Sequence, residues 1–134
     1  MSQTIIEWFL LKVPGAKERV QDILGIVPDP GIKKYVALLT QTGTDAPVPT
    51  VLENTLGEVP AWTREDQGEY RATISSPLFE LAKTWVVIGN PDFSLAFKTV
   101  ADRLSDTQIF VGMFNASAED GVLLGTALEI RVYP

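Results

Sequence analysis

Short runs of alternating apolar and polar residues, separated by turns, continue from residue 34 to the end of this 134-residue chain. The clearest run is the last, residues 127–133, in which every second side chain is a large aliphatic one. Because successive side chains of a β-strand point to opposite faces, such a run has one apolar and one polar face. Strands about ten residues apart with hairpin connections are typical of sandwiches and barrels. The sequence therefore predicts a mainly β protein with an antiparallel β-sandwich body, or a barrel-like variant, of about seven strands.

Turn residues divide this body into the predicted strands. Residues 61–64 and 69–74 flank a four-residue connection that ends in glycine, which predicts a hairpin. Residues 48–57 are expected to be an irregular excursion, because prolines stand at positions 47 and 49. Trp85 lies inside an apolar run and is expected in the core. The predicted strands cover residues 35–41, 61–64, 69–74, 83–89, 93–97, 109–113 and 127–133.

The first 31 residues differ in character and are expected to form an N-terminal arm, followed by the β-sandwich domain at residues 32–134. The apolar block at residues 5–13 fits neither repeat cleanly; its aromatic and β-branched content favours a strand, and a helix remains an alternative. Residues 16–24 carry apolar side chains at helical spacing and predict a short helix that Gly25 ends. The proline-bearing segment after it is the expected boundary.

The composition excludes several kinds of chemistry. The chain has no histidine and no cysteine, so it lacks the commonest general base, the commonest metal ligand and any thiolate. Its 17 acidic residues outnumber its 11 basic ones and give a formal charge of −6, which argues against a nucleic-acid partner because phosphate binding needs a basic stripe. We therefore expect no cofactor, no metal site and no catalytic residue.

The apolar content bears on assembly. Hydrophobic residues make up 46% of the chain, while only 21% of the residues are charged. This balance predicts more apolar surface than one small sandwich needs to hide, so other subunits are expected to cover part of it. We expect a homo-oligomer, with a trimer as the favoured closed ring.

No segment predicts a membrane span or an export signal. The longest apolar run, residues 5–11, is interrupted by Glu7 and is far shorter than the ~20 residues that a spanning helix needs. The residues before it lack the basic stretch that begins a signal peptide. We expect a protein that is made in the cytoplasm and is neither secreted nor transmembrane.

Acidic residues gather at two predicted turns, residues 65–69 and 119–120. Oxygen ligands of this kind hold Ca²⁺ in some loops, but the spacing of a calcium-binding loop is absent, so solvated turn residues are the favoured interpretation. Glu53, Glu69 and Asp92 are the candidates for a carboxylate-dependent hydrolase, which needs two acids across a cleft. Nothing in the sequence brings any two of them together.

Aromatic and arginine side chains are the candidate contact residues, because tryptophan, tyrosine and arginine dominate interface hot spots. Trp62, between a proline-bearing segment and an arginine, is the strongest of them, and stacking on a sugar ring is an alternative role for it. The turns at residues 43–57, 65–68 and 116–121 are expected to add variable contacts. The candidate contact residues are Trp8, Trp62, Arg64 and Tyr133.

Five stretches of the body carry a distinctive sequence. They read KYVALLTQTGTDAP at residues 34–47, TVLENTLG at 50–57, WTR at 62–64, GEY at 68–70 and LEIRVYP at 128–134. Together they resemble a recurrent C-terminal β-rich domain of uncharacterised virion-associated and tail-fibre-like proteins of bacteriophages. The resemblance covers residues 33–134 and is most distinctive in its first half. It implies a place in a virus particle, and it carries over no catalytic residue.

These observations lead to one hypothesis with two alternatives. We expect a non-enzymatic structural or attachment protein of a bacteriophage particle, associated with the capsid, tail or fibre, that acts through contacts with itself and with other virion proteins. Its expected localisation is the virion. A carbohydrate-binding β-sandwich module that uses Trp62 to bind a surface glycan is the alternative, and a carboxylate-dependent hydrolase is the least favoured function.

Overall fold

The computed structural model describes residues 31–90, 98–115 and 117–134, so the predictions for residues 1–30 and 93–97 lie outside the described residues. This part of the chain consists of strands and turns, without a helix, and so contains no helix able to cross a membrane. The strands are β1 (Lys33–Thr40), β2 (Val48–Asn54), β3 (Ala61–Asp66), β4 (Glu69–Thr73), β5 (Thr84–Ile88), β6 (Lys98–Ser105), β7 (Gln108–Asn115), β8 (Ser117–Ala118) and β9 (Thr126–Val132).

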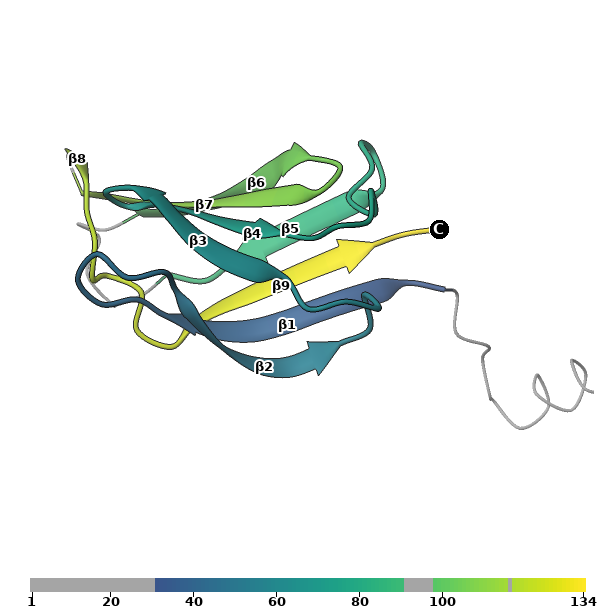
Figure 1. The fold of residues 1–134 in the computed structure, drawn as a ribbon, viewed down its shortest axis with the longest axis horizontal. Coiled ribbons are helices and arrows are strands. Elements are labelled where there is room, and N and C mark those ends of the chain that lie inside the picture. Colours follow the sequence, from purple (N-terminus) through teal and green to yellow (C-terminus); the bar gives the residue numbers. More distant parts are fainter. Residues whose placement is uncertain (1–30, 91–97, 116) are drawn as a thin grey trace, which may run out of the picture. The chain divides into compact units, whose positions relative to one another are not determined.

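The strands form two antiparallel sheets that pack face to face. The order in the first sheet is β2-β1-β9-β5, and in the second it is β3-β4-β7-β6, with β8 paired to β7. Figure 1 shows the two layers, with β1 and β2 in the lower one and β6 and β7 in the upper one. The predicted antiparallel β-sandwich is confirmed.

The core lies between the sheets and is built by alternate residues of the central strands. Each buried aliphatic side chain contributes about 1.5–3 kcal/mol. The inward-facing positions predicted within residues 109–113 and 127–133 are confirmed. The buried side chains of the central strands are Tyr35, Ala37 and Leu39 of β1, Tyr70 and Ala72 of β4, Ile109, Val111 and Met113 of β7, and Leu128, Ile130 and Val132 of β9.

Three strands differ from the prediction, the shortest being β8, which forms inside the turn expected at residues 116–121. β2 forms where an irregular segment was expected, because it is an edge strand and an edge can hold Pro49 without losing a central ladder bond. β6 is missing from the predicted set, since charged and apolar residues mix on its exposed face, as Asp102 and Leu104 do. Its sequence therefore lacks the apolar repeat that would have revealed it.

β5 coincides with the predicted strand at residues 83–89, but its tryptophan points outward. Trp85 is 42% exposed, whereas Val86 and Ile88 pack against the core. The expectation that Trp85 lies in the core is wrong. The run is apolar on both faces, yet the opposite sheet covers only the inner face of β5.

The β3–β4 hairpin is confirmed, with a tighter connection than predicted. Asp66 pairs with Glu69, so only two residues turn the chain, and the register shifts between Arg64 and Asp66. Gly68 has a φ of +68°, in the left-handed region that glycine adopts most easily.

Candidate contact surfaces

The strand order gathers three turns at the end of the sandwich where β1 finishes. These turns, at residues 41–47, 65–69 and 119–125, are called the loop end here. The backbone N–H of Gln41 donates to the Leu123 carbonyl at 3.0 Å and so joins the first turn to the third. Figure 1 shows the loop end on the left, opposite the C-terminus. Parts of all three predicted contact turns therefore share one end, although the middle of the predicted turn at residues 43–57 belongs to β2.

Asp120 is the centre of the loop end. Arg64 of β3 donates from Nη2 to Oδ2 at 2.7 Å, and its Nε contacts both carboxylate oxygens at 3.1 and 3.2 Å. The Gly68 N–H donates to Oδ1 at 3.0 Å, and the Tyr70 hydroxyl donates to the same oxygen at 2.7 Å. Hydrogen bonds to an ionised acceptor are about twice as strong as neutral ones. Asp120 thus holds the β3–β4 hairpin against the segment that leads to β9.

Gln41 extends this network to the turn after β1. It is 1% exposed, and its amide nitrogen donates to two carbonyl oxygens of that turn at 2.8 and 2.9 Å. Its Oε1 accepts from the Gly121 N–H at 2.6 Å and lies 2.9 Å from the Tyr70 hydroxyl. Since that hydroxyl has one hydrogen, Gln41 and Asp120 share it, and the charged oxygen is the nearer acceptor. All three turns are therefore connected by four side chains, those of Gln41, Arg64, Tyr70 and Asp120.

Asp120 is not the solvated turn residue that its sequence context predicted. Its side chain is 16% exposed, and the hydrogen bond from Arg64 lowers the pKa of Asp120 from 3.8 to about 2. Burial, and then the neighbouring carboxylate, raise the pKa of the Tyr70 hydroxyl, which keeps it a donor. The network therefore consists of an ionised acceptor surrounded by protonated donors.

This lowered pKa predicts a loss of stability in acid. A carboxylate whose pKa falls on folding stabilises the folded state above its unfolded pKa, and the stabilisation is lost as the pH falls through the folded pKa. The shift from 3.8 to about 2 corresponds to about 2 kcal/mol, which solvent screening reduces to about 1–2 kcal/mol. Between about pH 4 and pH 2, urea titration should show this additional loss in the wild type relative to Asp120→Asn. An equal decline in both proteins would contradict the prediction.

A second cluster lies at the opposite end, on the outer face of the first sheet. Cross-strand pairing places Trp85 of β5, Arg131 of β9 and Lys34 of β1 in one row. The Arg131 guanidinium lies 4.9 Å from the centroid of the Trp85 ring, and its Nε donates to Glu129 Oε1 at 2.6 Å. Tyr133 comes next to Arg131 on this face and is 40% exposed. Lys34, Trp85, Arg131 and Tyr133 are called the aromatic corner here.

The aromatic corner is exposed and held in place by its own contacts. Hydrogen bonds from Arg131, first to Glu129 and then to Tyr133, raise the pKa of the guanidinium, so Arg131 remains a cation across the Trp85 ring. Tryptophan, tyrosine and arginine are the residue types that carry most binding energy at interfaces. The alternation in residues 127–133 predicted the outward face of Arg131, but no sequence signal showed that β5 pairs with β9.

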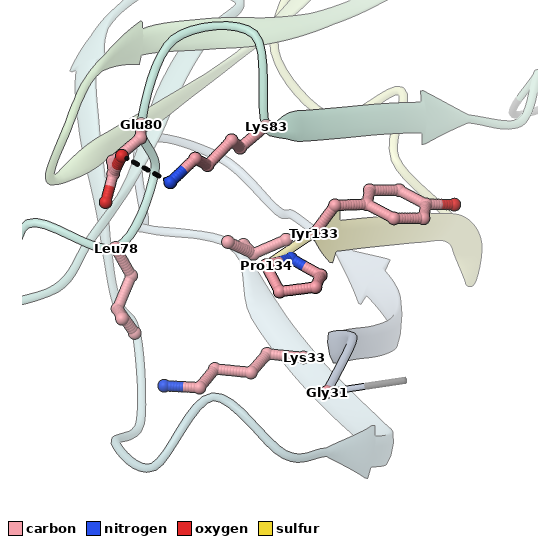
Figure 2. A pocket seen from close by; sticks show the side chains of 8 residues that line it. Gly31, Lys33, Leu78, Glu80, Lys83, Tyr133 and Pro134 are labelled. Atoms are coloured by element: carbon pink, nitrogen blue, oxygen red, sulfur yellow. Dashed lines mark ion pairs between the residues drawn. The ribbon is translucent and has the colours of Figure 1, made fainter. Parts of the chain in front are cut away.

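A shallow pocket of about 240 Å³ adjoins the aromatic corner and shares Tyr133 with it (Figure 2). Lys83 points toward Glu80 and reaches it at 3.0 Å, while Tyr133 lies between Lys83 and Lys33 in this view. The volume is below the roughly 300–1,000 Å³ of most small-molecule sites. Two lysines that line the pocket, Lys33 and Lys83, therefore lie close to the aromatic corner.

The structure separates the predicted contact residues. Trp8 lies outside the described residues, and Tyr133 belongs to the aromatic corner. The Trp62 indole N–H donates to the Tyr35 hydroxyl at 3.2 Å and its ring packs against the core, while Arg64 is bound to Asp120. Contact roles for these residues stay predictions, as does sugar stacking by Trp62.

The other candidate chemistry finds no support in the arrangement of acids. Glu53 lies on β2 and Glu69 on β4, in different sheets, and Asp92 is outside the described residues. Among residues 31–90, 98–115 and 117–134, no three acidic side chains converge to hold a metal ion. No protein-family model matches the chain, and no match to a curated protein or to a solved structure was found.

Proposed function

We propose that this chain is a non-enzymatic structural or attachment protein of a bacteriophage particle, and that its β-sandwich acts through protein–protein contacts. The observation that carries the contact function is the aromatic corner. Trp85 is 42% exposed and Tyr133 40%, although both are large residues that a lone domain would gain by burying.

The geometry of the corner supports a role in binding. Trp85 lies in the paired segment of β5 and under the Arg131 guanidinium, so its side chain loses little freedom when a partner covers it. A contact surface that is ordered before association avoids about 0.5–1.5 kcal/mol for each side chain that would otherwise be immobilised. Val87, 45% exposed, lies two positions further along the same face and extends the apolar area.

The place in a particle rests on the resemblance of residues 33–134 to virion-associated and tail-fibre-like domains. A β-sandwich whose turns are fixed by buried side chains, as the loop end is by Gln41 and Asp120, suits a part that must keep its form in an assembly. The expected partners are further copies of the chain and other virion proteins, and the expected oligomer is a closed ring such as a trimer.

The test is incorporation into purified particles. Phage particles from the source of the chain are banded on a density gradient, and the chain is quantified by mass spectrometry. We expect it in the particle fraction, and at least about tenfold less of a Trp85→Ala/Tyr133→Ala double variant, since each hot-spot truncation costs about 2 kcal/mol or more. Val59→Ala, at a valine that is 77% exposed outside the corner, is the control and should be incorporated normally. Absence of the wild type from the particles would overturn the virion assignment, and normal incorporation of the double variant would overturn the role of the corner.

A further inference from the structure

Charge is distributed unequally between the two ends of the sandwich. Five acids of the loop end make no ion pair with any other described residue. The sixth acid of these turns, Asp120, does not belong to this set because it forms an ion pair with Arg64. The five are Asp45, Glu65, Asp66, Glu69 and Glu119.

At the opposite end four cations surround the aromatic corner, and two of them make no ion pair within the described residues. Lys83 is paired with Glu80 at 3.0 Å and Arg131 with Glu129 at 2.6 Å. No acidic partner within the described residues lies near enough to pair with Lys33, at the pocket, or with Lys34, in the corner itself. Glu53 on β2 and Glu58 in the loop after it also make no ion pair and lie toward this end, so it is close to neutral overall, whereas the loop end carries five unpaired acids.

Each end also exposes large apolar side chains. At the corner these are Trp85 and Tyr133. At the loop end Leu124 is 65% exposed, and Val48, which begins β2 directly after the first of its turns, is 66% exposed. The two ends therefore match in both respects: cations beside aromatic rings on one, and acids beside aliphatic side chains on the other.

We infer that the aromatic corner binds the loop end of a second copy of this chain, so that copies associate head to tail. The inference rests on the proposed contact function and gives it a partner, but it does not depend on a place in a phage particle. A head-to-tail contact uses two different surfaces, and it closes into a ring, such as a trimer, if the rotation between copies allows. Lys33 and Lys34 of one copy would then face the unpaired acids of the next.

A symmetric face-to-face dimer is less consistent with the charges. Around its two-fold axis the same patch meets itself, so Lys33 and Lys34 would approach their own equivalents. Like charges brought together at an interface cost free energy and reduce the association rate. The unpaired acids at the loop end repel each other in the same way.

Salt dependence gives the first measurement. Copies with a net charge of −6 repel at long range, so non-specific association should strengthen when salt screens that repulsion. Head-to-tail contact should instead weaken, by at least about tenfold in dissociation constant between about 50 mM and 500 mM NaCl, because opposite charges meet at the interface. Sedimentation velocity over a concentration series measures this. A monomer at all concentrations, or association that strengthens with salt, would overturn the inference.

Charge reversal then distinguishes head-to-tail from symmetric contact. Variant A, Lys33→Glu/Lys34→Glu, makes the corner acidic. Variant B, Asp45→Lys/Glu65→Lys/Glu119→Lys, makes the loop end basic, because three lysines then face only Asp66 and Glu69. Each alone should be monomeric, because both of its ends then carry the same sign. An equimolar mixture should associate again, since the acidic corner of A meets the basic loop end of B while the basic corner of B meets the acidic loop end of A.

The control for variant A is Lys98→Glu, which reverses an exposed lysine on β6, away from the corner, and should associate like the wild type. Circular dichroism melting shows whether each variant is folded. Association of A or B alone, or no association in the mixture of two folded variants, would overturn head-to-tail contact. If the wild type is incorporated into particles but the mixture of variants A and B does not associate, head-to-tail contact is wrong and the proposed function is unaffected. If the mixture associates but the wild type is absent from particles, the virion assignment is wrong and head-to-tail contact is supported.

Discussion

Replacing Gly68 with alanine is expected to lower the free energy of unfolding by about 4 kcal/mol, enough to unfold much of a marginally stable domain. A Cβ at this position would lie 2.6 Å from the Glu119 nitrogen, and 2.8 Å from the carbonyl oxygens of both Glu119 and Met113. All three are backbone atoms, so no side chain can rotate away to relieve the clash.

Two further costs add to that clash. The φ of +68° at Gly68 is strained for alanine by about 1–2 kcal/mol. Moving the hairpin outward would stretch the bond from the Gly68 N–H to Asp120 and the bond from the Met113 N–H to the Gly68 carbonyl, at 3.0 and 2.9 Å. Each buried bond lost costs about 1 kcal/mol or more.

Gly57→Ala is the matched control. Its φ is +92°, and an added Cβ would have no atom within 4 Å, so it carries the backbone strain without the clash. We expect a loss of about 1–2 kcal/mol in this variant. Urea unfolding followed by tryptophan fluorescence compares the two. Equal losses at the two positions would show that Glu119 does not pack against Gly68 as the structure has it.

Much of the fold could be predicted because a β-strand with one buried face carries an apolar residue at every second position. The inner residues of β7 and β9 repeat with period two, and both strands were predicted with the correct face inward. Strands at the rim of a sheet are harder to recognise. β2 holds a proline that only an edge strand tolerates, and β6 mixes charged and apolar residues on its exposed face. Both lie at the end of their sheet's strand order, and that order is not visible in the sequence.

The candidate sites could be predicted only in part, because they depend on contacts between distant residues. The sequence predicts Tyr133 as a contact residue but places its neighbour Trp85 in the core, since an apolar run does not show which of its faces a second sheet will cover. The sequence context of Asp120 predicts a solvated turn acid. Its donors Arg64 and Tyr70 come from β3 and β4, more than forty residues earlier in the chain, so no local spacing could indicate the network.

The second large effect is expected from Asp120→Ala, which should cost about 3 kcal/mol. The change removes the acceptor for Arg64, for the Gly68 N–H and for the Tyr70 hydroxyl, and a buried donor without a partner costs about 1–3 kcal/mol. The loss is smaller than for a fully buried ion pair, because the Arg64 side chain is 25% exposed and can turn to water. Glu53→Ala, at an exposed acid on β2, is the control and should change stability by less than about 0.5 kcal/mol.

A double-mutant cycle with Tyr70→Phe shows whether these residues act as one network. The tyrosine hydroxyl donates to Asp120 at 2.7 Å, so removing both partners should cost less than the sum of the single losses, by about 1 kcal/mol. Glu53→Ala combined with Tyr70→Phe should be additive, because the two residues lie in different sheets. Additivity between Asp120 and Tyr70 would mean that the hydroxyl is satisfied by Gln41 alone, 2.9 Å away, and that the loop end is held by two separate clusters.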